Sequence, residues 1–173
     1  MLISYLFQEG RTRILEKELI GLEQAYWYLH ELVQDENSGL LEHEILWDVH
    51  ERVTQGTFQR GYSKCQRVVE YQGRLHFYCS PEIINAQMTL LLDQYNSQWW
   101  KIKTKTRDNY SLANLIVMFL VRFLTVHPFP DANGRVGRLI VGYILESFGV
   151  AFPLVILNAD YESWCNTLKL IRK

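Results

Sequence analysis

The chain has 173 residues, enough for one domain with a sizeable core and short for two. Hydrophobic residues make up 48% of the sequence and charged residues 21%, as in an ordinary globular protein. A net charge of −1 argues against a general nucleic-acid-binding protein, because such proteins carry a basic surplus. We therefore expect residues 1–173 to form a single domain.

Cysteine usage and the N-terminal sequence predict the cellular compartment of the protein. The cysteines form no Cys-x-x-Cys pair, so neither a zinc site nor a disulfide framework is expected from Cys65, Cys79 and Cys165. The first residues lack the basic segment and the apolar length of a signal peptide, and we expect no apolar run to be long enough to span a membrane. These features predict a cytoplasmic protein with free thiols and no membrane partner.

The first half of the sequence predicts two helices and a hairpin. Apolar residues at helical spacing predict helices over residues 14–33 and about 42–53. β-prone residues follow, and Tyr71-Gln72-Gly73 supplies a turn, so residues 66–78 are expected to form a β-hairpin. A lone hairpin is only marginally stable, which indicates that this one docks or contacts a ligand or partner.

The second half predicts further helices. A serine as N-cap and a proline at the first helical position, residues 80–81, predict a helix to about residue 99, followed by a basic loop over 101–107. Ser111 is expected to cap a helix that is apolar nearly all round, which is typical of a buried central helix, and Pro128 stops it.

Two more helices complete the predicted fold. One should begin near Asn133 and run to Phe148, where Gly149 ends it, and the last should begin at Asp160. The sequence therefore predicts an all-α fold, a helical bundle with one small β-hairpin.

The stretch from His127 to Arg138 contains the residue types of a phosphate site. A loop that enters a helix at Asn133-Gly134 exposes backbone N–H groups at the positive end of the helix dipole. Gly134 leaves that backbone open to a phosphate, and Ala132 is small for the same reason. Two arginines three residues apart, Arg135 and Arg138, suit a ligand with more than one phosphate.

The same stretch supplies a metal ligand and a base. Asp131 is a hard carboxylate of the kind that holds Mg²⁺ beside phosphates. Histidine is the side chain whose unperturbed pKa lies close to neutrality, so His127 could take a proton from an attacking hydroxyl, while Phe129 is expected to anchor the loop in the core. A polar helix-entry loop with surface arginines is the alternative, and we reject it for the set as a whole. The spacing of a Walker A loop is absent.

His-Pro-Phe-x-Asp-Ala-Asn-Gly-Arg-x-x-Arg, complete from His127 to Arg138, resembles the signature of Fic domains. The resemblance implies transfer of AMP from ATP, with Mg²⁺, to a hydroxyl of a target protein. It implies that His127 is the base and Asp131 the magnesium ligand. The nucleotide would contact Ala132, Asn133, Gly134, Arg135, Gly137 and Arg138, with the α- and β-phosphates at Asn133 and Gly134 and the outer phosphates at the arginines. Glycine at position 134 resembles the AMP-transferring members, whereas members that phosphorylate their target have lysine there.

The resemblance spans roughly residues 17–168. The hairpin looks like the family's flap, which implies that a target protein docks along it by strand addition and that its residues lie near the nucleotide: Val68, Val69, Glu70 and Tyr71. Ser63 and Lys64 replace the family's usual arginine–threonine pair before the flap. Tyr161 and Glu162 resemble a segment that touches the adenine.

Many Fic proteins carry an inhibitory Ser/Thr-x-x-x-Glu-Gly/Asn helix whose glutamate pairs with the second motif arginine, here Arg138. Only Glu9-Gly10 echoes this motif, and Ser4 lies five residues before Glu9 rather than four. We therefore predict that the chain lacks an internal inhibitor, which leaves constitutive activity, a fragment or a separate inhibitory partner. The oligomeric state stays open, with a dimer as one possibility.

Other functions stay open at this stage. The motif reads phosphates and not a base, so transfer of UMP, phosphocholine or phosphate is an alternative to AMP. A non-catalytic module that binds a nucleotide or a partner is another, which the intact His127 and Asp131 disfavour. A metal site at His43 and His50 is less expected than surface or capping roles for both histidines.

Overall fold

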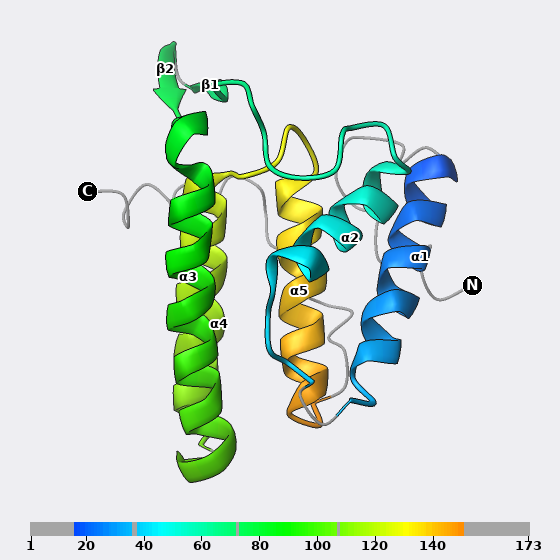
Figure 1. Ribbon diagram of the computed structural model, residues 1–173, viewed down its shortest axis with the longest axis vertical. Helices are drawn as coiled ribbons and strands as arrows, with labels where there is room; N and C mark the ends of the chain where they lie inside the picture. The colour runs from blue at the N-terminus through cyan, green and yellow to red at the C-terminus, as the bar shows by residue number, and fades with distance from the viewer. Residues whose placement is uncertain (1–15, 36–37, 72, 107, 151–173) are drawn as a thin grey trace.

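The computed structural model describes residues 16–35, 38–71, 73–106 and 108–150. In chain order the elements are α1 (Glu16–Leu32), α2 (His43–Thr54), β1 (Val68–Tyr71), β2 (Arg74–Phe77), α3 (Pro81–Lys101), the π-helical η2 (Ile102–Thr106), α4 (Asn109–Val126) and α5 (Asn133–Ser147) (Figure 1). The predicted all-α bundle with one small hairpin is confirmed. The helix expected from Asp160 lies outside the described residues.

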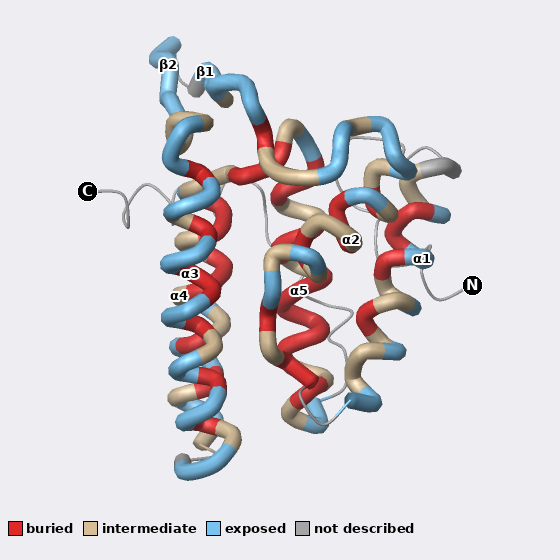
Figure 2. Tube along the Cα trace, viewed as in Figure 1, coloured by how far each residue is buried: buried red, intermediate tan, exposed pale blue. Residues whose placement is uncertain are grey.

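Helix α5 is the centre of the bundle. It contacts α1 and α2 on one side and α4 on the other, and α3 packs on α4 (Figure 1). Its residues are buried along nearly its whole length, as the red trace in Figure 2 shows. The expectation that the preceding helix, α4, is the buried central one is therefore wrong.

Helix α4 buries one face and leaves another open. Leu115, Phe119 and Phe123 are buried, whereas the Val117 side chain is 56% exposed. The helix is 18 residues long with a mean hydropathy of 1.5, so it is long and apolar enough by length and composition to cross a membrane, contrary to our reading of the sequence. The core helix of a soluble protein meets the same criteria, and α4 packs on α3 and α5.

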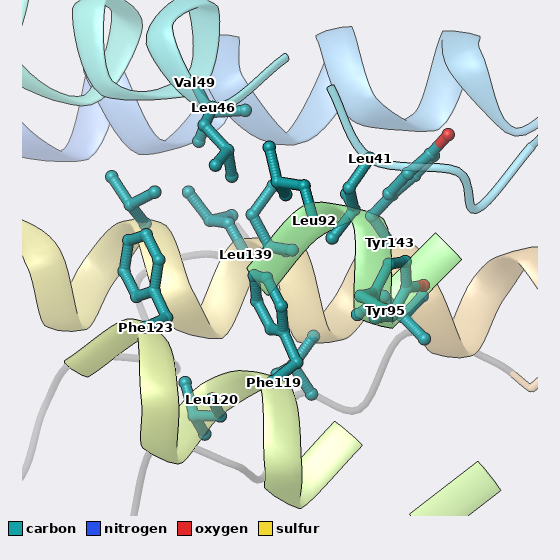
Figure 3. Close-up of a cluster of buried hydrophobic side chains, with 14 of the residues drawn as sticks. Leu41, Leu46, Val49, Leu92, Tyr95, Phe119, Leu120, Phe123, Leu139 and Tyr143 are labelled. Atoms are coloured by element: carbon teal, nitrogen blue, oxygen red, sulfur yellow. The ribbon is translucent and has the colours of Figure 1, made fainter. Parts of the chain in front are cut away.

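Aromatic and aliphatic side chains from α1, α2, α3, α4 and α5 form the core, part of which is shown in Figure 3. Two buried tyrosine hydroxyls tie the segment before α2 to this core. Tyr95 donates to the carbonyl of Gly39 at 2.8 Å, and the N–H of Gly39 donates to Tyr143 at 2.8 Å. Buried polar groups of this kind are stabilising only when they are paired, as both are here.

Three local predictions need correction. The basic segment that was expected to be a loop continues α3 as the π-helical turn η2, because Lys103 donates to the carbonyl of Ser147 at 3.1 Å and lies over the Trp99 ring. Asp108 caps α4, and its carboxylate accepts from the N–H of Ser111 at 2.7 Å. Ser80 does occupy the N-cap position of α3, but its hydroxyl donates to Glu82 rather than capping the helix.

Candidate active site

The predicted motif forms the loop between α4 and α5, at the end of the bundle from which the hairpin projects (Figure 1). Both ends of this loop have left-handed backbone. His127, the C-cap of α4, has φ 54° and Ala132, the N-cap of α5, has φ 62°. Such conformations cost non-glycine residues roughly 1–3 kcal/mol and gather at functional sites.

The loop is held closed by its own asparagine. The Asn133 side chain is buried, accepts from the N–H of Phe129 at 2.9 Å and donates to the carbonyl of Phe129 at 2.8 Å. Phe129 is fully buried, as predicted, and the N–H of Ser63 donates to the carbonyl of Pro128 at 2.8 Å. The Asn133 amide therefore shapes the loop, and contact with phosphate is left to its backbone.

The N-terminus of α5 has the features of an anion site. Ala132 provides no side-chain cap, so the first N–H groups of the helix face out of the loop without an intrahelical partner. A Cβ at Gly134 would lie 3.3 Å from Nη1 of Arg138, which shows that this guanidinium lies close over the glycine backbone. The positive charge of Arg138 and the first N–H groups of α5 thus lie together at the N-terminus of this helix.

The guanidinium of Arg138 is a buried positive charge with one nitrogen left unpaired by the described residues. Its Nε is buried and has no hydrogen-bond partner among the residues that the structure describes. Burial lowers the pKa of its guanidinium, and the neighbouring charge of Arg135 lowers it further. Because a buried charge is costly unless it is paired, this arrangement favours binding of an anion.

Arg135 is already engaged on both edges. It donates through Nη1 to Oε1 of Glu18 in α1 at 2.7 Å, and through Nη2 to Oδ2 of Asp131 at 3.1 Å. Asp131 itself is well exposed, with 60% of its side chain accessible. One accessible carboxylate beside a helix N-terminus fits Mg²⁺ held jointly with phosphate oxygens, provided that Arg135 moves away from it.

The imidazole of His127 stacks on the ring of Tyr78, which directly follows β2. The ring centroids are 3.9 Å apart and the planes differ by 16°. The N–H of His127 donates to the carbonyl of Phe123 at 2.9 Å, so the backbone of the histidine is fixed to α4. Sequence reasoning missed Tyr78, because nothing local pairs it with a residue so distant in the chain.

The hairpin is confirmed as an antiparallel pair with Val68 opposite Phe77 and Tyr71 opposite Arg74. Adjacent residues of a strand point to opposite faces, so Glu70, opposite Leu75, lies on the face that also carries three apolar residues, Val68, Leu75 and Phe77. These three side chains are 46%, 60% and 69% exposed, whereas Val69, on the other face, is 36% exposed. The predicted flap residues, Glu70 among them, thus lie in an open hairpin, and its apolar face lies uncovered by the described residues.

His50 is a site residue that the sequence analysis misassigned. It is buried rather than on the surface, and it stacks on Phe129 with centroids 4.1 Å apart and planes within 4°. Burial lowers its pKa from 6.5 to about 4, and the charge of Asp131 acts in the opposite direction. Its position on the same helical face as Leu46, Val49 and Val53 was the available signal.

The remaining candidates fall into three groups. Gly137 faces the core, because a Cβ there would lie 2.8 Å from Cδ1 of Leu120, so its role is close helix packing rather than ligand contact. His43 contacts the hydroxyls of Tyr62 at 2.7 Å and Thr89 at 3.1 Å, and the described residues contain no group of three metal-binding side chains. Tyr161 and Glu162 lie outside the described residues.

Comparison with known proteins identifies this arrangement. Residues 40–145 match the Fic/DOC family, which covers more than half of the chain. The chain belongs to the Fic/DOC family.

Individual relatives agree with this assignment. The chain is 34% identical over 93 residues to a Fido domain-containing protein of Dictyostelium discoideum, over 54% of this chain and 60% of that protein. It is 31% identical over 152 residues to protein adenylyltransferase fic-1 of Caenorhabditis elegans, over 87% of this chain and 28% of that protein. The chain thus spans less than two thirds of the length of either relative.

The fold agrees with a solved structure. A Fic domain containing signaling protein from Bacteroides thetaiotaomicron superposes with a TM-score of 0.76 at 23% identity, over 97% of this chain and 62% of that one. At this identity the likeness establishes the Fic fold.

Proposed function

We propose that this Fic protein is a protein adenylyltransferase, which transfers AMP from ATP to a Ser, Thr or Tyr hydroxyl of a target protein. The observation that carries the proposal is the conjunction of His127, exposed Asp131 and the cationic N-terminus of α5 within one rigid loop. Relatives such as the C. elegans protein bear the name protein adenylyltransferase, which supports the same activity.

The reaction is an in-line displacement at phosphorus. The target hydroxyl oxygen attacks the α-phosphorus of ATP, the bond from that phosphorus to the bridging oxygen of the β-phosphate breaks, and pyrophosphate leaves. His127 accepts the hydroxyl proton as the new phosphorus–oxygen bond forms. Mg²⁺ bound at Asp131 would neutralise charge on the phosphates. Positioning and charge stabilisation by the α5 N-terminus and Arg138 supply most of the barrier reduction.

The target is proposed to dock along the hairpin. An extended segment added to a strand edge gains backbone hydrogen bonds, and side-chain pockets or faces then give specificity. The exposed face formed by Val68, Leu75 and Phe77 suits an apolar side chain of that segment.

Transfer of another group is the second candidate. The cations and backbone N–H groups of the described site suit phosphates rather than a base, so transfer of UMP, phosphocholine or phosphate could use the same motif, and Tyr161 and Glu162 remain the proposed adenine contacts. Glycine at position 134 leaves room for the Arg138 guanidinium beside the helix backbone, which favours recognition of a polyphosphate.

The decisive test follows radioactive label from ATP onto protein. We expect α-³²P-ATP to label the chain itself or added target proteins, and γ-³²P-ATP to leave them unlabelled. His127→Ala should abolish labelling and keep the Kd for ATP within about threefold, because the base is not needed for binding. Label from the γ position alone would replace AMP transfer by phosphate transfer.

A further inference from the structure

The stack between Tyr78 and His127 joins the hairpin to the catalytic loop across a long sequence separation. His127 and Tyr78 are both partly buried, and their rings lie face to face with centroids 3.9 Å apart. A face-to-face contact restricts the plane of an imidazole through its ring faces, whereas the ring nitrogens lie at the edge of the ring. The stack therefore restricts rotation of the ring without occupying the atom that would accept a proton.

The backbone of Tyr78 is fixed to the opposite arm of the hairpin. Its N–H donates to the carbonyl of Arg67 at 3.0 Å, and its carbonyl accepts from the side chain of Gln66 at 2.9 Å. The bond to Arg67 extends the ladder of β1 and β2 by one step, and the bond from the Gln66 side chain reinforces it. Any displacement of the hairpin thus moves the ring of Tyr78.

The backbone of His127 is fixed separately from its ring. The residue is the left-handed C-cap of α4, with φ 54° and ψ 57°, and its N–H is bonded to Phe123. Backbone geometry therefore sets where the side chain starts but not the rotation of the ring. The ring that stacks on the His127 imidazole is that of Tyr78, which belongs to the hairpin segment.

We propose that Tyr78 is a positioning residue, which sets the ring plane of His127 and makes the geometry of the base depend on the hairpin. This inference rests on the proposed function and deepens it. A target segment that pairs with the hairpin would fix the hairpin and, through Tyr78, the base.

The test compares two substitutions that differ in the ring. Tyr78→Phe keeps the aromatic face and removes the hydroxyl, whereas Tyr78→Leu removes the face and keeps most of the bulk. With α-³²P-ATP and self-modification as the reaction, we expect Tyr78→Phe to stay within about twofold of the parent kcat. Tyr78→Leu should lose at least tenfold in kcat, with the Kd for ATP unchanged.

A matched control separates positioning from loss of structure. Tyr110→Leu makes the same replacement at the start of α4, where Tyr110 is 78% exposed, and should leave kcat unchanged. All variants should keep the far-ultraviolet circular dichroism of the parent. Equal losses in Tyr78→Phe and Tyr78→Leu, or full activity in Tyr78→Leu, would overturn the proposal.

A second measurement does not depend on activity. In protein labelled with ¹⁵N-histidine, the ring nitrogens of His127, assigned with His127→Ala, should change chemical shift and titration midpoint in Tyr78→Leu and not in Tyr78→Phe or Tyr110→Leu. If the parent transfers no nucleotide, the proposed function fails while this spectrum still tests the stack. Unchanged His127 signals in Tyr78→Leu would show that the stack does not hold the ring.

Discussion

At the scale of single residues, the site works because buried polar groups hold the loop before any ligand arrives. Asn133 bonds both backbone groups of Phe129, and Phe129 lies against His50. Preorganisation of this kind removes the cost of ordering the loop when nucleotide binds. The residues proposed to touch the nucleotide are therefore only part of the candidate site, and those beneath the loop decide its shape.

His50 gives the protein a pH-dependent stability. Burial lowers its pKa to about 4 in the folded state, from 6.5 when exposed, so the folded state resists protonation. The free energy of unfolding is therefore highest above pH 6.5. It falls by about 3 kcal/mol in total as the pH drops toward 4. Denaturant unfolding between pH 7 and 4.5 should show this loss in the parent and a flatter profile in His50→Phe. Parallel profiles for the two proteins would rule out this role.

At the scale of elements, local signals predicted most boundaries. The turn around Gly73, the proline at the start of α3 and Gly149 after α5 are chemical features of the backbone itself, so the sequence carries them directly. The prediction of a loop after α3 was wrong because the helical form of this basic segment depends on contacts of Lys103 with Trp99 and Ser147. The prediction that α4 is the central helix was wrong because apolar composition does not show which neighbouring helices cover a given helix.

The motif of the candidate active site was predictable, and the residues that support it were not. The twelve residues from His127 to Arg138 are contiguous, so their chemistry can be read without the fold. Glu18, His50 and Tyr78 reach the same loop from α1, α2 and the hairpin, and no local pattern joins residues that are so distant in sequence. Of these three residues, only His50 had a signal in the sequence that indicated burial, namely its position on the inward face of its helix.

The ion pair between α1 and α5 competes with the proposed substrate. Glu18 takes one terminal nitrogen of Arg135, the arginine proposed to meet an outer phosphate, and partly exposed pairs of this kind are worth up to about 1 kcal/mol. We expect Glu18→Gln to lower the Kd for Mg·ATP by roughly two- to fivefold in isothermal titration calorimetry. Glu23→Gln, an exposed site on the same helix, should leave the Kd unchanged. Weaker binding in Glu18→Gln would show instead that Glu18 holds Arg135 in place.

At the scale of the whole molecule, the site is assembled from every part of the bundle around α5. The loop lies on the end of α5, α1 supplies Glu18, α2 supplies His50, and the segment before the hairpin bonds the loop through Ser63. A ligand that binds this loop therefore binds only the folded bundle. Its binding free energy must appear as added stability of the entire domain.

The resulting thermal shift tests phosphate and metal recognition together. At a hundredfold excess over its Kd, Mg·ATP should stabilise His127→Ala, which cannot turn it over, by about 2.7 kcal/mol. For a domain of this size that raises Tm by roughly 5–10 °C. Adenosine should produce less than a third of the shift, because the described site offers cations and backbone N–H groups rather than an adenine contact. In His127→Ala/Asp131→Asn the shift should no longer depend on Mg²⁺. A metal-dependent shift that survives this second substitution would mean that the metal is held elsewhere, and Asp131 would then serve only to hold Arg135.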